Sequence, residues 1–276
     1  MTPEQRYQFD TLGYLHLKNA LTPEELRRAQ DAADRYINTP PEKLPVGFCF
    51  RNLEHHKHYQ RAFAYDRALE HLTMHPSVWK IIKEFTGNKP CLARANLICD
   101  THEHEPLHLH NGPGQTVVLG VNSNGANSPH GFGAPGSLHC DHFNIFWYFT
   151  DVQPGDGGLL LAPGSHKGEF EFPFERVFDS VDDLPQGIEN VVARAGDAVI
   201  ISEQVFHGSL KWKQANRDRR VLVARYALQY QLSRQQDMNM EQTVLARLMP
   251  ETLELLETCW RSHEKEISKR DVIRLI

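Results

Sequence analysis

Cysteine is scarce in this sequence and follows the pattern of neither a disulfide framework nor a zinc site. Five cysteines are spread over 276 residues, and no two of them are spaced as Cys-x-x-Cys. They are Cys49, Cys91, Cys99, Cys140 and Cys259. An odd, scattered set argues against a disulfide scaffold, and the missing close pairs argue against a structural zinc.

Long apolar runs and an excess of basic charge are also missing. No stretch is apolar enough over a sufficient length for a membrane span, and no signal peptide is recognisable. The net charge is −5, without a basic block or an alternation of basic and aromatic residues. We therefore expect a cytoplasmic protein whose partners include neither a membrane nor nucleic acid.

The predicted elements run from helices through strands back to helices. Residues 22–25 (TPEE) combine an N-cap, a proline and a capping-box glutamate, and helical spacing follows them. A second helical region, 67–85, is interrupted at His75 by the proline that follows it. Residues 92–230 read as short strands between Gly/Pro turns, and the tail is helical again, with Pro250 starting a helix.

This order predicts a single domain, 1–276, that is mainly β with flanking helices. We expect a double-stranded β-helix (a cupin-like jelly roll) at 91–230, preceded by a helical part at 1–90 and followed by helices at 231–276. A chain of this length can bury a sizeable core, and no internal repeat divides it.

The segment 196–226 (GDAVIISEQVFHGSLKWKQANRDRRVLVARY) carries the clearest functional signal. The run at 198–201 predicts a buried strand, Val205 and Phe206 open the next strand with His207 near its beginning, and Arg219 leads into a third strand at 221–226. A non-haem iron oxygenase needs such a pair: an imidazole for the metal and, about a dozen residues later, a cation that binds the carboxylate of 2-oxoglutarate. A lone histidine beside a glycine is more often a turn residue, so the combination carries the argument.

Several segments also carry recognisable motifs. They are 9–15 (FDTLGYL), 21–26 (LTPEEL), 151–159 (DVQPGDGGL), 162–167 (APGSHK) and the Gly-Asp, His-Gly-Ser and Arg series of 196–219. Together they resemble the phytanoyl-CoA dioxygenase (PhyH) family of Fe(II)/2-oxoglutarate oxygenases, over nearly the whole chain. The resemblance implies a jelly roll that uses Fe(II), 2-oxoglutarate and O₂.

The resemblance also implies roles for particular residues. His207 would be a metal ligand, and Arg219 would bind the distal carboxylate of 2-oxoglutarate, with Ser209 as an additional hydrogen-bond donor. Arg220 faces the opposite side of its strand and is predicted to be structural. Trp212 is predicted to line the substrate mouth, with a place in the core as the alternative.

The first metal ligand has two candidates, and one of them belongs to a literal His-x-Asp. His139 and Asp141 are two residues apart, as in the proximal half of an iron-binding facial triad. However, the residues before them, 128–137, are rich in glycine and proline and do not predict the strand that should present the motif.

His110 fits the expected strand order better, and we favour it. Leu107–His110 alternates as a half-buried strand should, and a turn follows it. The pattern resembles a branch of the family with His-x-Gly in place of His-x-Asp, so the carboxylate must come from elsewhere. The predicted metal ligands are thus His110, Asp141 and His207, with His139 and Glu203 as alternatives. If no carboxylate binds, an open position remains for halide, as in the related halogenases.

Two other motif matches are set aside, and one further histidine is given no ligand role. Residues 104–108 spell the His-Glu-x-x-His of zinc proteases, but Pro106 would break the helix on which that motif depends. Residues 131–136 spell a dinucleotide fingerprint, but no predicted strand precedes them, so we interpret them as a flexible loop that could serve as a lid. His166, within the Pro-Gly-Ser-His-Lys motif, is predicted to be a structural loop residue.

The sequence therefore predicts a non-haem Fe(II)/2-oxoglutarate-dependent dioxygenase. It would oxidise a C–H bond of a small-molecule substrate, most simply by hydroxylation, and release succinate and CO₂. The alternative is an iron-free jelly roll that binds a ligand. The residues do not name the substrate.

Overall fold

The computed structural model describes most of the chain. The described residues are 1–46, 48, 50–53, 56–102, 105–112, 116–118, 138–168, 171–174, 176–231, 240–259, 261–263 and 266–267. None of the helices within these ranges is long and apolar enough to cross a membrane.

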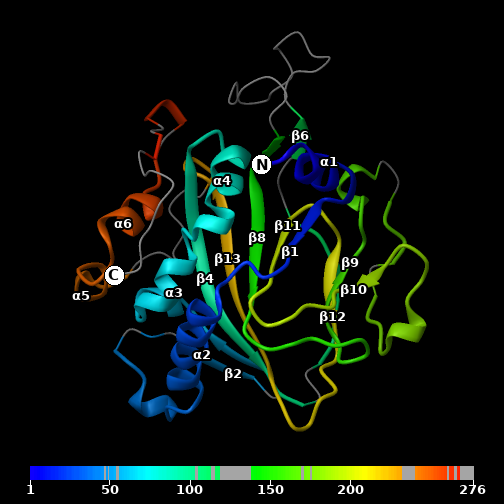
Figure 1. The fold of residues 1–276 in the computed structure, drawn as a ribbon, viewed down its shortest axis with the longest axis horizontal. Coiled ribbons are helices and arrows are strands. Elements are labelled where there is room, and N and C mark those ends of the chain that lie inside the picture. The colour runs from blue at the N-terminus through cyan, green and yellow to red at the C-terminus, as the bar shows by residue number, and fades with distance from the viewer. Residues whose placement is uncertain are drawn as a thin grey trace.

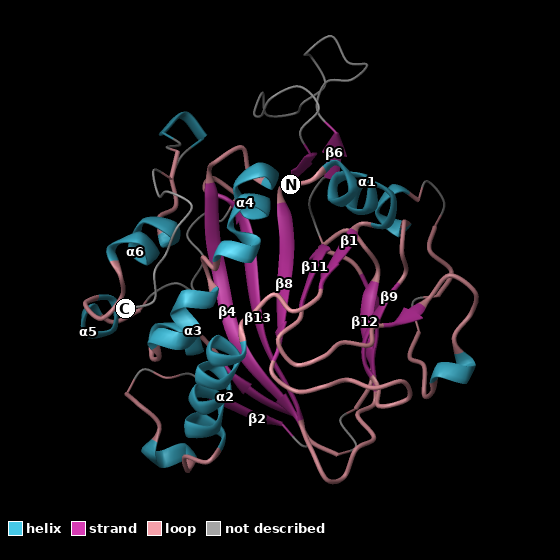
Figure 2. Cartoon of the chain, in the orientation of Figure 1, coloured by secondary structure: helices cyan, strands magenta, loops and turns pink. Residues whose placement is uncertain are grey.

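Two antiparallel sheets face each other and form the predicted jelly roll (Figure 2). The larger sheet has seven strands in the order β1 (Tyr14–Leu17), β11 (Ala198–Ser202), β8 (His142–Tyr148), β13 (Arg219–Leu228), β4 (Pro90–Asp100), β3 (His56–Tyr59) and β2 (Phe50–Leu53). The smaller sheet has the order β10 (Glu189–Asn190), β9 (Gly158–Leu161), β12 (His207–Leu210) and β5 (Leu107–His110). A separate ladder joins β6 (Thr116–Val118) to β7 (Leu138–Cys140).

Helices flank the larger sheet. They are α1 (Pro3–Leu12), α2 (Pro23–Ile37), α3 (Arg67–Leu72), α4 (Pro76–Phe85), α5 (Gln242–Leu245) and α6 (Pro250–Leu256). Helices α2, α3, α4 and α6 lie on the side of β4, and α1 lies near β1 and β6 (Figure 1). Short 3-10 turns lie at Pro41–Lys43, Ala62–Ala64, Ser165–Lys167, Val181–Asp183 and Arg261–His263.

The helix starts agree with the sequence prediction. Thr22 caps α2 and forms a capping box with Glu25, and Pro250 begins α6. The predicted break at His75 separates α3 from α4, and the His75 side chain caps α4. The description of 1–90 as a helical part is wrong in one respect, because β1, β2 and β3 also lie there and extend the larger sheet.

Alternation along β13 divides the core into two layers. Leu222, Ala224 and Tyr226 face the helices, whereas Val221 and Val223 face the smaller sheet. The inner layer is completed from both sheets by Tyr148, Leu159, Leu161, Val199, Ile201 and Trp212, among others. By the same alternation Arg219 and Arg225 lie on the inner face of β13, where they contact buried acidic groups.

Tyr226→Phe is expected to destabilise the fold. The buried Tyr226 hydroxyl donates a 2.6 Å hydrogen bond to the Thr73 carbonyl oxygen at the end of α3. Without the hydroxyl that carbonyl stays buried and loses this partner, which costs about 1–3 kcal/mol. Chemical denaturation measures the loss. Tyr7→Phe is the control because Tyr7 is 71% exposed, and an equal effect of both variants would contradict the prediction.

Candidate metal and cosubstrate site

Two imidazoles face each other between neighbouring strands of the smaller sheet. His207, the first residue of β12, is paired in register with His110, the last residue of β5. Their ring centroids are 4.5 Å apart, and His207 is only 7% exposed. His110 and His207 are 97 positions apart in the sequence, and the register of β5 against β12 brings them together.

A backbone carbonyl oxygen fixes the orientation of each ring through its Nδ1 atom. The Nδ1 atom of His110 lies 3.0 Å from the His108 carbonyl oxygen, and that of His207 lies 2.7 Å from the Val205 carbonyl oxygen. A carbonyl only accepts, so Nδ1 donates in each case and Nε2 of the neutral ring keeps its lone pair. Burial lowers the pKa of His207, which favours this neutral, ligating form.

Arg219 is held deep on the inner face of β13. It is 7% exposed, and its Nε and Nη2 atoms lie 2.8 and 2.5 Å from Oδ2 of Asp100 on β4. Oδ1 of Asp100 is in turn 2.5 Å from Nδ1 of His56. The acid therefore anchors the Nε and Nη2 edge of the guanidinium. Sequence reasoning missed Asp100, because only the β4–β13 register reveals the pairing.

Two small residues adjoin these groups, Ser209 on the strand of His207 and Gly158 beside Arg219. Ser209 follows His207 by two positions on the same face of β12, and its hydroxyl accepts a hydrogen bond from Leu107 N. Gly158 on β9 lies against the guanidinium, since a Cβ there would be 3.0 Å from Nη1 of Arg219. Arg219 thus adjoins a residue without a side chain, and His207 is followed on its face of β12 by a small polar residue. Arg220, by contrast, faces the helices and pairs with Asp34 of α2, as expected of a structural residue.

A buried polar group adjoins the imidazole pair. Glu203, in the turn before β12, is 4% exposed, and its Oε1 lies 2.5 Å from Asn144 Nδ2 and 2.7 Å from Arg225 Nη2. Arg225 Nε also donates to Asn144 Oδ1. Burial lowers the pKa of Arg225. Pairing with the carboxylate offsets the cost of burying the guanidinium.

His139 and Asp141 lie elsewhere. His139 is on β7 and pairs with Val117 of β6, so it belongs to neither sheet that encloses the imidazole pair. Asp141 is buried just before β8, and its Oδ2 accepts a 2.7 Å hydrogen bond from Gln231 Nε2. The structure therefore pairs His110 with His207, leaves Glu203 in the turn just before His207, and gives Asp141 a different partner.

The structure corrects the expectation for Trp212. Its side chain is fully buried in the layer between the sheets, and its Nε1 donates to the Arg217 carbonyl oxygen. A large apolar ring is most stable in that layer, so Trp212 is a core residue and does not line the mouth. His166 contacts the Asp10 carbonyl oxygen of α1, in agreement with a structural role.

The structure describes only part of the two motif matches that were set aside from the sequence. Residues 107–108 belong to strand β5, so the second half of the His-Glu-x-x-His match is not helical. His104 and the whole of 131–136, including the suggested lid, lie outside the described residues.

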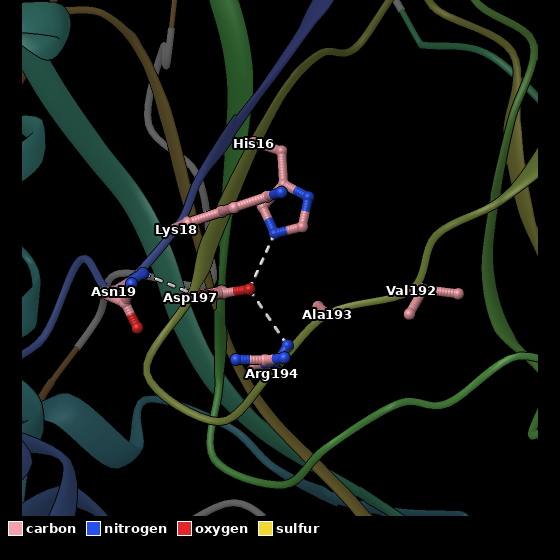
Figure 3. A pocket seen from close by; sticks show the side chains of 7 residues that line it. All are labelled: His16, Lys18, Asn19, Val192, Ala193, Arg194 and Asp197. Atoms are coloured by element: carbon pink, nitrogen blue, oxygen red, sulfur yellow. Dashed lines mark hydrogen bonds and ion pairs between the residues drawn. The ribbon is translucent and has the colours of Figure 1, made fainter.

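Two cavities differ in their relation to this site. One, of about 550 Å³, is lined by residues next to the paired strands, such as Asn111, Gln204 and Phe206, and by Phe172. The other, of about 270 Å³, lies at the edge strand β1 (Figure 3). There Asp197 accepts hydrogen bonds from the backbone N–H groups of Asn19 and Arg194 and lies 2.9 Å from His16 Nε2, so its carboxylate is used in joining turns.

One further group could hold a metal by distance alone. Within the described part of the chain, only Glu25, His71 and His75 have ligand atoms that all lie within 4.8 Å of one another. Glu25 forms the capping box of α2 and His75 caps α4, so these side chains serve as links between helices. We interpret this group as structural.

Comparison with known proteins decides the family. The model of the phytanoyl-CoA dioxygenase (PhyH) family matches residues 9–221. The chain belongs to this family. Members of the phytanoyl-CoA dioxygenase family are oxidoreductases that require Fe(II), 2-oxoglutarate and O₂, so the predicted family, enzyme class and cofactors are confirmed. No curated protein sequence matches the chain.

Solved structures of other oxygenases share the fold. HygX from Streptomyces hygroscopicus, with nickel and 2-oxoglutarate bound, has a TM-score of 0.65 and 21% identity over 83% of this chain and 87% of its own. EctD from S. alaskensis, with 2-oxoglutarate and 5-hydroxyectoine, has a TM-score of 0.61 and 14% identity over 83% and 76%. The epimerase SnoN from nogalamycin biosynthesis has a TM-score of 0.59 and 14% identity over 82% and 83%.

Proposed function

We propose that this PhyH-family enzyme oxidises a C–H bond of a small-molecule substrate at an iron held by His110 and His207. The single observation that carries the proposal is the pair of facing imidazoles, each oriented through Nδ1 so that Nε2 is available to metal. Bound Fe(II) would supply the coupling of C–H oxidation by O₂ to the decarboxylation of 2-oxoglutarate. In the simplest outcome, substrate C–H, O₂ and 2-oxoglutarate become C–OH, succinate and CO₂.

Arg219 is proposed to bind the distal carboxylate of 2-oxoglutarate. Its planar fork can donate two parallel hydrogen bonds to a carboxylate, which a lysine cannot do. Asp100 already holds one edge of the Arg219 guanidinium in place, so binding of the cosubstrate costs little additional side-chain conformational entropy. Ser209, on the same face as His207, is placed to donate its hydroxyl hydrogen to the same carboxylate. The apolar layer around Trp212 and Leu161 excludes water from the interior.

The cavity beside the paired strands is proposed to admit the substrate. Its volume of about 550 Å³ falls in the range of small-molecule sites. Phe172 and Phe206 stack at 3.8 Å, and Asn111, Gln204 and Glu171 add polar groups, so the lining suits a molecule with both an apolar face and hydrogen-bonding groups. Related structures hold small molecules too: HygX was solved with hygromycin B and SnoN with nogalamycin RO.

Removing either candidate for the proximal ligand tests the proposal. His110→Ala is expected to lose stoichiometric iron and iron-dependent formation of succinate from 2-oxoglutarate, because one of the two imidazoles is gone. His139→Ala, the matched control, is expected to keep both. The readouts are bound iron per folded chain and succinate released with and without candidate substrates. Iron retained by His110→Ala but lost by His139→Ala would contradict this ligand assignment, and a wild-type chain that binds no iron would indicate the ligand-binding alternative.

A further inference from the structure

The turn after His110 lacks the side chain that would complete a metal triad. Gly112 stands two positions after His110, where a His-x-Asp motif carries its carboxylate. Gly112 does not have a left-handed φ, so its backbone conformation would accept a side chain. The absence of a carboxylate at this position is therefore not imposed by the backbone.

Another carboxylate occupies the space that a residue at 112 would fill. A Cβ built on Gly112 would lie 2.4 Å from Oε2 of Glu203, about as far as the carboxylate oxygens of an aspartate lie from its own Cβ. The backbone holds the two residues together, because Gly112 N donates a 2.7 Å hydrogen bond to the Glu203 carbonyl oxygen. The Glu203 oxygen thus lies at the distance from this Cβ at which an aspartate at position 112 would hold its own carboxylate oxygens.

The two carboxylate oxygens of Glu203 differ in their hydrogen-bond partners. Oε1 accepts hydrogen bonds from Asn144 and Arg225, whereas Oε2 accepts none from any residue that the structure describes. An ionised carboxylate oxygen only accepts, so Oε2 remains available to a cation. A divalent ion bound at Nε2 of His110 and His207 would be such a cation.

We propose that Glu203 is the third protein ligand of the iron and replaces the aspartate that Gly112 cannot supply. The inference rests on the proposed function, since it completes the same site. Ligand atoms of the three residues do not yet lie within 4.8 Å of one another, so the Glu203 carboxylate turns toward the imidazoles when metal binds. Asp141, the carboxylate favoured from sequence, is engaged by Gln231.

A third protein ligand has a consequence for the reaction. When two imidazoles and one carboxylate bind, three positions remain for bidentate 2-oxoglutarate and O₂. No protein position is then left open for a halide, so the enzyme hydroxylates or otherwise oxidises the substrate and does not halogenate it.

The experiment compares Co(II) and Fe(II) affinity among matched variants. Glu203→Gln keeps an oxygen for Asn144 and Arg225 but loses the charge, and it is expected to weaken metal binding by more than about 100-fold, beyond the 10–100-fold typical of a residue that only orients a ligand. Asp141→Asn is the matched control and is expected to stay within about tenfold of wild type, short of the upper limit of such orienting effects. Thermal unfolding verifies that each variant is folded.

A relocated carboxylate provides the decisive comparison. In Gly112→Asp/Glu203→Ala the carboxylate moves to position 112, into space that the alanine vacates, and metal affinity is expected to recover most of the loss. The visible spectrum of bound Co(II), which reports the ligand set, should return toward that of wild type. His207→Ala, measured in parallel, tests the proposed function separately: if it keeps the metal, the site itself is misplaced.

Three results would overturn the assignment of Glu203. They are wild-type affinity in Glu203→Gln, loss of metal in Asp141→Asn, and a Glu203→Gln loss that the double variant does not restore. The last result would show that Glu203 only supports the histidines.

Discussion

Replacing His207 with alanine is expected to abolish iron binding. His207 provides one of the two facing imidazoles, and its Nε2 has no substitute among the inward-facing residues of β12, which continues with Gly208, Ser209 and Leu210. A site that loses one imidazole keeps too few ligands to hold Fe(II) against water. Equilibrium dialysis followed by iron analysis of the folded variant measures the effect.

The control for this variant is another buried histidine. His75→Ala removes a side chain that caps α4 and lies outside the barrel, so it is expected to change stability but not iron content. Stoichiometric iron in folded His207→Ala would show that the metal binds elsewhere, and the group of Glu25, His71 and His75 would then be the first place to look.

Arg219→Ala is expected to leave iron in place and to raise the 2-oxoglutarate requirement strongly. Loss of one partner of a buried, hydrogen-bonded charge pair costs about 2–5 kcal/mol, which corresponds to roughly 30- to 5,000-fold in affinity. The apparent affinity for 2-oxoglutarate, measured by succinate formation or by titration of the iron-loaded protein, gives the result. The 2-oxoglutarate requirement of Arg219→Lys should lie between those of wild type and Arg219→Ala, because lysine keeps the charge but lacks the planar guanidinium.

Two comparisons separate cosubstrate binding from stability. Arg219→Ala also leaves Asp100, which is fully buried, with His56 as the partner on its other oxygen, so unfolding must be measured alongside. Arg220→Ala removes the neighbouring arginine, which pairs with Asp34 and Asp218 outside the barrel, and it should leave the 2-oxoglutarate requirement unchanged. An unchanged requirement in Arg219→Ala would assign the carboxylate to another cation.

Local features of the sequence were predictable because they depend on neighbouring residues. The capping box at Thr22 and the break before Pro76 follow from backbone geometry within a few residues. The strand at Leu107–His110 was also predicted, but its regular alternation was not found, because Leu107 is 46% exposed and the β5–β12 register shifts between His207 and Ser209. The opposite orientations of Arg219 and Arg220 follow from the period of a strand in the same way. The family motifs, too, are short segments that can be recognised one at a time.

Contacts across the sheets were beyond local patterns. Asp100 lies 119 residues from Arg219, and only the β4–β13 register brings them together. Strands β1, β2 and β3 are four residues each and were not predicted, because short strands at a sheet edge take their stability from the neighbour with which they pair. Trp212 was placed at the mouth because its sequence neighbourhood does not show which layer will cover it.

The sequence by itself determined the family, the jelly roll, the cofactors and the two residues His207 and Arg219 as candidates, because each depends on motifs carried by short segments. Only the tertiary structure decided which histidine faces His207 and which carboxylate lies beside the pair. His139 belongs to a literal His-x-Asp, yet strand register places it in another ladder and aligns His110 with His207. Glu203 was one of two candidate carboxylates in the sequence, and only the fold shows that its Oε2 lies against Gly112, because residues in different turns are brought together by tertiary structure.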